Sequence, residues 1–178
     1  MPAPDHRRNY LILVLLGAWA LSACSWTAEP DLAGTIAWVE ARHPGVQHVD
    51  VDELRRDAGS GLLLFDVRSP EEYAVSHLPG ALYWSDHARA LEQIDAQHTQ
   101  RVIVYCSVGE RSSRAASALQ AARPELTVAN LRGGIFAWAM AGAPLVDVSG
   151  AATTRVHPYD AHWGRLLPSK LHANGDSP

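Results

Sequence analysis

The chain has 178 residues, of which 47% are hydrophobic, and its formal net charge at pH 7 is −4. This hydrophobic content is sufficient for the core of one small domain. The slightly acidic balance excludes the strongly basic surface that is typical of proteins that bind nucleic acid. The sequence contains no internal repeat and no low-complexity tract.

The first 23 residues have the pattern of a targeting segment. Arg7 and Arg8 provide a positive start, residues 10–20 are apolar, and small residues precede Cys24. The apolar run is shorter than the roughly 20 residues that a membrane-spanning helix needs. The segment resembles a bacterial lipoprotein signal, which implies cleavage before Cys24 and lipidation of that cysteine. An ordinary secretory signal or an uncleaved anchor remains open as the alternative.

Lipidation of Cys24 would anchor the mature chain to a membrane of the bacterial cell envelope, and the chain would not cross that membrane. The resemblance implies that the chain faces the periplasm, with residues 24–34 as a lipidated tether. Ser25, where Asp would mark retention at the inner membrane, points to the outer membrane if the host is Gram-negative. Cys106 would then have no disulfide partner in the chain, and an unpaired thiol in an oxidising compartment favours a functional use.

Strands and helices are expected to alternate through residues 35–145. The expected helices cover residues 35–42, a short segment from the cap Asp52 to Asp57, 70–77 after the cap Ser69, 88–94, 112–122 and 133–141. The expected strands cover residues 49–51, 62–66, 82–84, 101–105 and 126–131. This alternation predicts an α/β fold in which helices cover both faces of a central parallel sheet. Residues 146–178 form an extension that we expect to pack partly on the domain, with its last eight residues disordered.

The segment from Arg101 to Leu119 carries the strongest chemical signal. Its β-branched and aromatic strand ends abruptly at Cys106, and a tight loop then leads into a helix. This order points backbone N–H groups and the positive end of the helix at Cys106. Such a field favours a thiolate, so we expect Cys106 to be a nucleophile at neutral pH. A buried structural cysteine is the alternative, but Gly109 and the following helix favour a functional one.

Three segments of the chain resemble the rhodanese family. The upstream segment comprises Phe65–Arg68, Glu71–Tyr73 and His77–Ala81, the central one is the loop from Cys106 to Arg111, and the closing one comprises Leu131–Ile135, Ala137–Trp138 and Gly142–Pro144. Their order and their span argue against a chance match. The resemblance implies a three-layer rhodanese-like domain over residues 35–145 and sulfurtransferase activity.

The resemblance also implies a mechanism, in which Cys106 takes sulfane sulfur from a small donor such as thiosulfate and becomes a persulfide. The sulfur then passes to cyanide, a thiol or a protein acceptor, and no cofactor is implied beyond the persulfide. The residues expected to form the active loop are Ser107, Val108, Gly109, Glu110, Arg111 and Ser112. The chain departs from many active rhodaneses because Ser107 replaces a cationic residue and Glu110 adds a negative charge. Both changes weaken the expectation that dianionic thiosulfate is the natural donor.

Arg111 has two possible roles in this interpretation. It orients an anionic donor if it faces inward, or it forms an ion pair. The candidate partners for an ion pair are Glu110, Glu125 and Asp66.

Asp66 and Arg68 are candidate supporting residues, because they lie at the carboxyl end of a predicted strand, where α/β sheets place their sites. Together with Glu72, which lies close by in sequence, they either buttress the Cys106 loop or form a local ion-pair network that fixes the turn. Trp138 is interpreted as a core residue and His77 as a structural one. No metal site is expected, because His157 and His162 lack thiol or carboxylate support.

Two other functions remain open. The first is a non-catalytic rhodanese-fold module of the envelope that binds a partner. The second is a cysteine-dependent phosphatase or arsenate reductase, a class whose loops place five residues between the cysteine and the arginine. This chain has four residues between Cys106 and Arg111, which argues against the second function.

Overall fold

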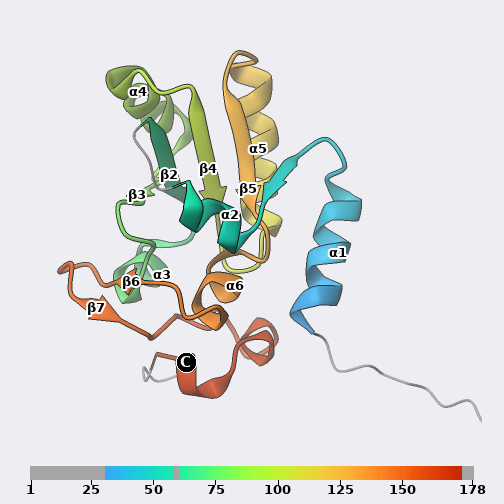
Figure 1. Ribbon diagram of the computed structural model, residues 1–178, viewed down its shortest axis with the longest axis vertical. Coiled ribbons are helices and arrows are strands. Elements are labelled where there is room, and N and C mark those ends of the chain that lie inside the picture. Colours follow the sequence, from blue (N-terminus) through green and yellow to red (C-terminus); the bar gives the residue numbers. More distant parts are fainter. Residues whose placement is uncertain (1–30, 58–60, 174–178) are drawn as a thin grey trace, which may run out of the picture.

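The computed structural model describes residues 31–57 and 61–173 (Figure 1). The predicted signal segment, Cys24, the tether up to residue 30 and the end of the chain after Ala173 lie outside these residues. Within the described ranges, no helix has the length and hydropathy needed to cross a bilayer.

A five-stranded parallel sheet forms the centre of the domain, with strand order β1-β5-β4-β2-β3. The strands are β1 (Gln47–Val49), β2 (Leu62–Asp66), β3 (Leu82–Tyr83), β4 (Arg101–Tyr105) and β5 (Thr127–Leu131). This sheet confirms the predicted α/β class. Because β4 is the middle strand, the residues that follow it lie at the centre of the sheet's carboxyl edge.

Six α-helices accompany the sheet in the described ranges. They are α1 (Leu32–Arg42), α2 (Val51–Arg56), α3 (Pro70–Val75), α4 (His87–Gln97), α5 (Glu110–Ala122) and α6 (Gly134–Met140). Strand β1 ends two residues earlier than predicted, because Asp50 and not Asp52 caps α2. The Asp50 carboxylate accepts the Glu53 N–H at 2.7 Å, so the helix begins at Val51.

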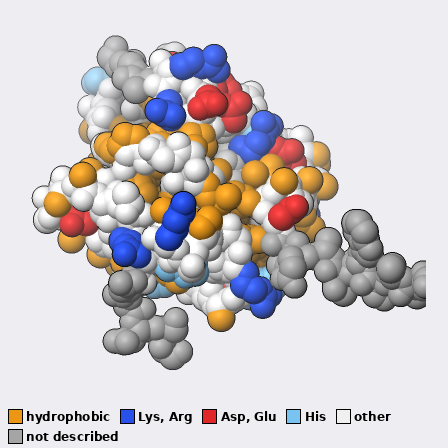
Figure 2. All heavy atoms as spheres, turned by 60° about the horizontal axis from the view of Figure 1, so that its bottom comes forward, with side chains coloured by type: hydrophobic (Ala, Val, Ile, Leu, Met, Phe, Trp, Pro, Cys, Tyr) orange, Lys and Arg blue, Asp and Glu red, His pale blue; other side chains and the backbone are white. Residues whose placement is uncertain are grey.

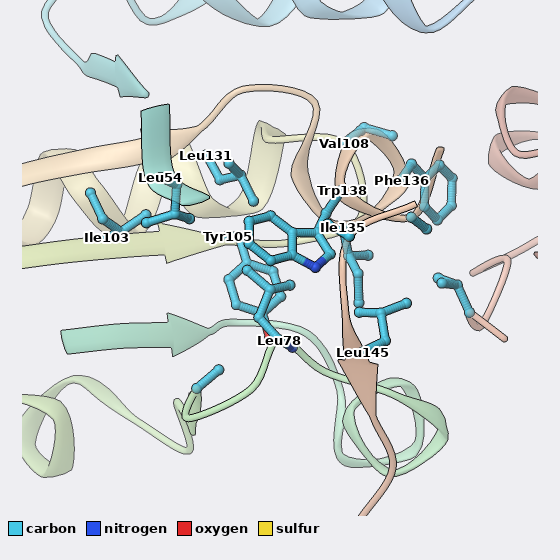
Figure 3. Close-up of a cluster of buried hydrophobic side chains, with 14 of the residues drawn as sticks. Leu54, Leu78, Ile103, Tyr105, Val108, Leu131, Ile135, Phe136, Trp138 and Leu145 are labelled. Atoms are coloured by element: carbon cyan, nitrogen blue, oxygen red, sulfur yellow. The ribbon is translucent and has the colours of Figure 1, made fainter. Parts of the chain in front are cut away.

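Side chains of β4 alternate between two hydrophobic clusters, one on each face of the sheet. Val102 and Val104 pack in a cluster with residues of α4 and α5. Ile103 and Tyr105 belong to the other cluster, which includes residues of α2 and α6 and is shown in Figure 3. Trp138 is 7% exposed in this second cluster, as the sequence predicts, and its indole N–H donates to the Pro144 carbonyl at 2.7 Å.

The described part of the C-terminal extension, residues 146–173, packs below the carboxyl ends of the strands in Figure 1. A small antiparallel pair that the sequence did not predict, β6 (Leu145–Val146) and β7 (Ala152–Thr153), joins the end of the domain to the extension. The extension continues through two 3-10 helices, η1 (Trp163–Leu166) and η2 (Ser169–Leu171).

Buried side chains attach the extension to the domain. Val156, Leu166 and Leu167 share the hydrophobic cluster of Val108, a residue of the Cys106 loop. The chain remains hydrogen-bonded up to Ala173, whose N–H donates to the Val156 carbonyl at 2.9 Å. The extension therefore shares a core with the segment that carries Cys106.

Candidate active site

Cys106 lies directly after the central strand β4, and the loop that follows it leads into α5. Gly109 is the N-cap of this helix, and its N–H donates to the Cys106 sulfur at 3.2 Å. Cys106 is 1% exposed. The donated hydrogen bond and the helix N-terminus together stabilise negative charge on the sulfur.

The loop needs glycine at position 109 for two reasons. Gly109 has a φ of +106°, a conformation that side-chain-bearing residues rarely adopt, and a Cβ there would lie 3.0 Å from the Asn130 Nδ2 atom. The glycine therefore allows the tight turn that brings its own N–H to the sulfur.

The start of α6 holds the backbone of the Cys106 loop. The Ile135 N–H donates to the Cys106 carbonyl at 2.9 Å, and the Phe136 N–H donates to the Ser107 carbonyl at 3.1 Å. A Cβ at Gly134 would lie 2.2 Å from the Cys106 carbonyl oxygen, so only glycine permits this approach. The closing segment seen in the sequence thus fixes the position of the loop.

Arg111 pairs with Glu72 of α3, and not with Glu110, Glu125 or Asp66, the candidate partners from the sequence. Its two terminal nitrogens donate to the two Glu72 carboxylate oxygens, each at 2.8 Å. Ser107 completes the arrangement, because it donates to Glu72 at 2.9 Å and accepts from Arg111 at 3.0 Å. The carboxylate, the hydroxyl and the guanidinium form a closed network beside the Cys106 loop.

The capping box of α3 explains why Glu72 is the partner. The Glu72 carboxylate accepts the Ser69 N–H at 3.0 Å, while the Ser69 hydroxyl accepts the Glu72 N–H at 3.2 Å. This reciprocal cap holds the Glu72 side chain at the helix N-terminus, close to the Cys106 loop. Glu72 is only 2% exposed, so its charge requires the partner that Arg111 provides.

The pKa values reflect this pairing. Burial raises the pKa of Glu72, but the hydrogen bonds from Arg111 and the Ser69 N–H, with the charges of Arg111 and Arg68, lower it to about 2. Burial lowers the pKa of Arg111, whereas its hydrogen bonds to Glu72 and the charges of Cys106 and Glu72 raise it above its ordinary value overall. The site therefore holds a guanidinium that is charged throughout and largely neutralised by one carboxylate.

Asp66 and Arg68 form the local ion-pair network of the turn after β2. Their side chains are fully buried and meet at 2.7 Å. Arg68 also donates to the Ser76 carbonyl at 2.5 Å, and its backbone N–H donates to Asp66 at 3.0 Å. The neighbouring Val67 N–H donates to the Tyr105 carbonyl, just before Cys106, at 3.0 Å. The pair thus fixes a turn that is attached to the end of the central strand.

Glu110 has its own partners on the outer side of the loop. Its carboxylate contacts the His43 Nε2 atom at 2.8 Å and accepts from Arg114 at 2.6 Å. Burial raises the pKa of Glu110, but the hydrogen bonds with His43 and Arg114 lower it below its ordinary value overall. This acid connects α5 to the end of α1.

Val108 and Ser112 anchor the loop from inside. Val108 is 5% exposed in the second hydrophobic cluster, and the buried Ser112 hydroxyl donates to the Asn130 Oδ1 atom at 2.6 Å. Asn130 also lies 3.2 Å from the His48 Nδ1 atom. Sequence reasoning did not single out Asn130, because an asparagine in a strand carries no pattern that shows its partner.

A further residue that the sequence analysis missed is Tyr159 of the C-terminal extension. Its ring centroid lies 4.7 Å from the Arg111 guanidinium carbon. Tyr159 lies outside the three segments that resemble the rhodanese family, so no sequence signal connects it to the site.

In the described ranges, no group of three or more His, Cys, Asp or Glu side chains is arranged to hold a metal ion.

Comparison with known proteins identifies the fold family. The model of the family described as "Rhodanese-like domain" matches residues 50–141, which is just over half of the chain. The chain belongs to the rhodanese-like domain family. Cys106, Gly109, Arg111 and the turn of Asp66 all lie inside this match.

Two curated relatives carry sulfurtransferase in their names. The chain is 37% identical over 107 residues to a "Sulfurtransferase" of Allochromatium vinosum, an alignment that covers 59% of this chain and 99% of that protein. It is 34% identical over 87 residues to a "Probable adenylyltransferase/sulfurtransferase MoeZ" of Mycobacterium tuberculosis, which covers 47% of this chain and 21% of that protein.

A solved structure agrees with the family. The thiosulfate sulfurtransferase of Pseudomonas aeruginosa superposes with a TM-score of 0.55 at 26% identity, over 68% of this chain. The chain matches only 24% of the length of that protein. The comparisons therefore show the rhodanese-like family, and proteins named as sulfurtransferases are among the relatives of this chain.

Proposed function

We propose that this rhodanese-like protein is a sulfurtransferase that carries sulfane sulfur on Cys106. The observation that supports this most directly is the environment of the sulfur, which accepts the Gly109 N–H at 3.2 Å at the N-terminus of α5. Two curated relatives that carry sulfurtransferase in their names are in agreement. The same donor that stabilises the thiolate would stabilise a persulfide anion.

The proposed reaction has two displacement steps. In the first, the Cys106 thiolate attacks the outer sulfur of a donor such as thiosulfate, a bond forms between the two sulfurs, and sulfite leaves with the electron pair of the broken S–S bond. In the second, cyanide or a thiolate attacks the outer sulfur of the Cys106 persulfide. Thiocyanate or a new persulfide leaves, and the Cys106 thiolate is restored.

The charge of the site bears on the choice of donor. Arg111 supplies the positive charge of the loop, and Glu72 neutralises most of it. The residue directly after Cys106 is Ser107, which has no charge. A dianion gains little electrostatic stabilisation from such a loop. We therefore expect thiosulfate to be a working but weakly bound donor, with a high KM. The 1% exposure of Cys106 favours donors slim enough to present a single sulfur atom.

The proposed location is the bacterial cell envelope, with lipid on Cys24 as the membrane attachment. The sequence pattern before Cys24 supports this location. The test compares the full-length chain with its Cys24→Ala variant after separation of membrane and soluble fractions. We expect the wild-type protein in the membrane fraction and the variant outside it, and equal partition of the two would contradict the proposal.

The activity test measures thiocyanate formed from thiosulfate and cyanide. The wild-type protein should show ping-pong kinetics, and Cys106→Ser should reduce the rate to background. A phosphatase assay with p-nitrophenyl phosphate on the same preparation tests the competing function. Phosphate release that depends on Cys106, without thiocyanate formation, would overturn the proposal. Absence of both activities in a folded, reduced protein would favour a partner-binding module.

A further inference from the structure

The C-terminal extension contributes an aromatic side chain to the active site. The family match ends at residue 141, whereas Tyr159 lies well beyond it. Its ring centroid is 4.7 Å from the Arg111 guanidinium carbon, which is the geometry of a cation–π contact. Arg111 therefore donates hydrogen bonds to Glu72 and Ser107, and its guanidinium carbon lies over the Tyr159 ring.

The backbone at Tyr159 is held in an unfavourable conformation. Its φ is +70°, in the left-handed region that bulky side chains rarely adopt. Its N–H donates to the His157 Nδ1 atom at 3.0 Å, and the Asp160 N–H donates to the Pro158 carbonyl at 3.0 Å. Strained residues of this kind cluster at functional sites, because the surrounding structure has to maintain them.

The rest of the extension provides the support that this strain requires. Val156 is fully buried, and its N–H donates to the Leu171 carbonyl at 2.8 Å. The His172 ring contacts the Gly164 and Leu167 carbonyls at 3.1 and 2.8 Å. Figure 2 shows the face that this end of the molecule presents, where basic and hydrophobic side chains lie next to one another. Burial and internal hydrogen bonds thus hold the extension in place. Tyr159, which is 46% exposed, lies on the surface of the extension beside the active loop.

We propose that Tyr159 is a positioning residue for Arg111 and that the C-terminal extension completes the active site through it. The ring packs against the guanidinium and keeps its nitrogens toward Glu72 and Ser107. In this place the charge of Arg111 acts on Cys106 and on an anionic reactant that approaches it. Without the ring, Glu72 and Ser107 alone hold the guanidinium, and water reaches the side that the ring covered, which weakens the effect of its charge on the sulfur.

The proposal has two readouts, and only the second rests on the proposed sulfurtransfer. The first is alkylation of Cys106 by anionic iodoacetate and by neutral iodoacetamide, which measures the charge felt at the sulfur. The ratio of the two rates cancels any general change in access or reactivity of the thiol. The second readout is the KM for thiosulfate. A protein without sulfurtransferase activity would fail the proposed function but would still give the alkylation ratio.

Tyr159→Asn and Tyr159→Phe form a matched pair of variants. Asparagine removes the ring but tolerates the left-handed backbone, so unfolding of the extension is not expected to confound the result. Phenylalanine keeps the ring and its cation–π contact. We expect Tyr159→Asn to lower the iodoacetate-to-iodoacetamide ratio about two- to fivefold, while Tyr159→Phe leaves it within about twofold of the wild-type value.

Arg111→Met supplies the background that separates positioning from a general structural role. If Tyr159 acts through Arg111, Tyr159→Asn should not change the alkylation ratio further in the Arg111→Met protein. The KM for thiosulfate should rise in Tyr159→Asn with kcat little changed. An unchanged ratio in Tyr159→Asn, an equal drop in Tyr159→Phe, or the full drop in the Arg111→Met background would each overturn the proposal.

Discussion

Two arginine–carboxylate pairs flank the candidate active site. They differ in how deeply they are buried and in how far apart the two partners lie in the sequence. Asp66 and Arg68 are two residues apart, and both side chains are fully buried. Glu72 and Arg111 are 39 residues apart, and Arg111 remains 35% exposed. The first pair closes a turn, whereas the second joins α3 to the loop that carries Cys106.

This difference predicts that one pair contributes mainly to the stability of the fold and the other mainly to the reactivity of Cys106. The Asp66–Arg68 pair donates and accepts within its own turn and at the Ser76 carbonyl, so its loss is expected to affect folding. The Glu72–Arg111 pair shares Ser107 and faces Tyr159, so its loss is expected to change the charge near the sulfur. Variants of the two pairs test whether these roles are distinct.

The largest expected effect is the loss of free energy of unfolding in the Asp66→Asn variant. The variant removes the only carboxylate that pairs with the fully buried Arg68 in the described structure, and breaking such a pair costs about 3–5 kcal/mol. Urea unfolding measures the change in the free energy of unfolding. The rate of sulfur transfer per folded molecule should change little. A stability loss below about 1 kcal/mol would contradict the structural role assigned to this pair.

Glu72→Gln should have a smaller effect on stability and a clear effect on the donor. The partly exposed Arg111 can gain water contacts when its partner loses charge, so the stability loss is limited. Its guanidinium is then no longer neutralised, and we expect the KM for thiosulfate to fall on the order of fivefold. The measurement is steady-state kinetics with thiosulfate and cyanide. A higher KM would show that Glu72 contributes to donor binding through more than its charge.

The pH dependence of stability provides a further test of Glu72. Its pKa falls from 4.5 to about 2 on folding, so the ionised form is favoured by the native state. The stabilisation is fully present above about pH 4.5 and is lost as pH falls toward 2. Urea unfolding of the wild-type and Glu72→Gln proteins should show a difference near pH 7 that shrinks near about pH 3. A difference that does not depend on pH would contradict the depressed pKa.

Ser107→Ala should have the smallest effect of the series. The variant removes one hydroxyl that donates to Glu72 and accepts from Arg111, while the bidentate ion pair remains. A single buried hydrogen bond contributes about 1 kcal/mol, which urea unfolding resolves. A loss as large as that of Asp66→Asn would mean that Ser107 holds the whole network together.

Local patterns allowed much of this structure to be predicted from the sequence. The order of strand, loop and helix around Cys106, the glycine at position 109 and the cap at Ser69 each depend on residues that are close in the chain. The parallel sheet followed from the alternation of strands and helices. These features are encoded over a few residues, so a single sequence reveals them.

The partners of Arg111 could not be predicted in this way. Glu72 lies one helix and two strands away in sequence, and its position depends on the registry of β2 beside β4. Tyr159 lies in an extension whose packing depends on Val156, Leu166 and Leu167, residues with no periodic pattern. Long-range contacts of charged side chains have no signature in composition or spacing, and here they determine the electrostatics of the site.

The most direct test of the central claim is the intact mass of the purified protein after incubation with thiosulfate. We predict that the wild-type protein gains the mass of one sulfur atom, that cyanide removes it, and that Cys106→Ser gains nothing. No gain in the folded, reduced wild-type protein, or an equal gain in Cys106→Ser, would contradict a persulfide on Cys106.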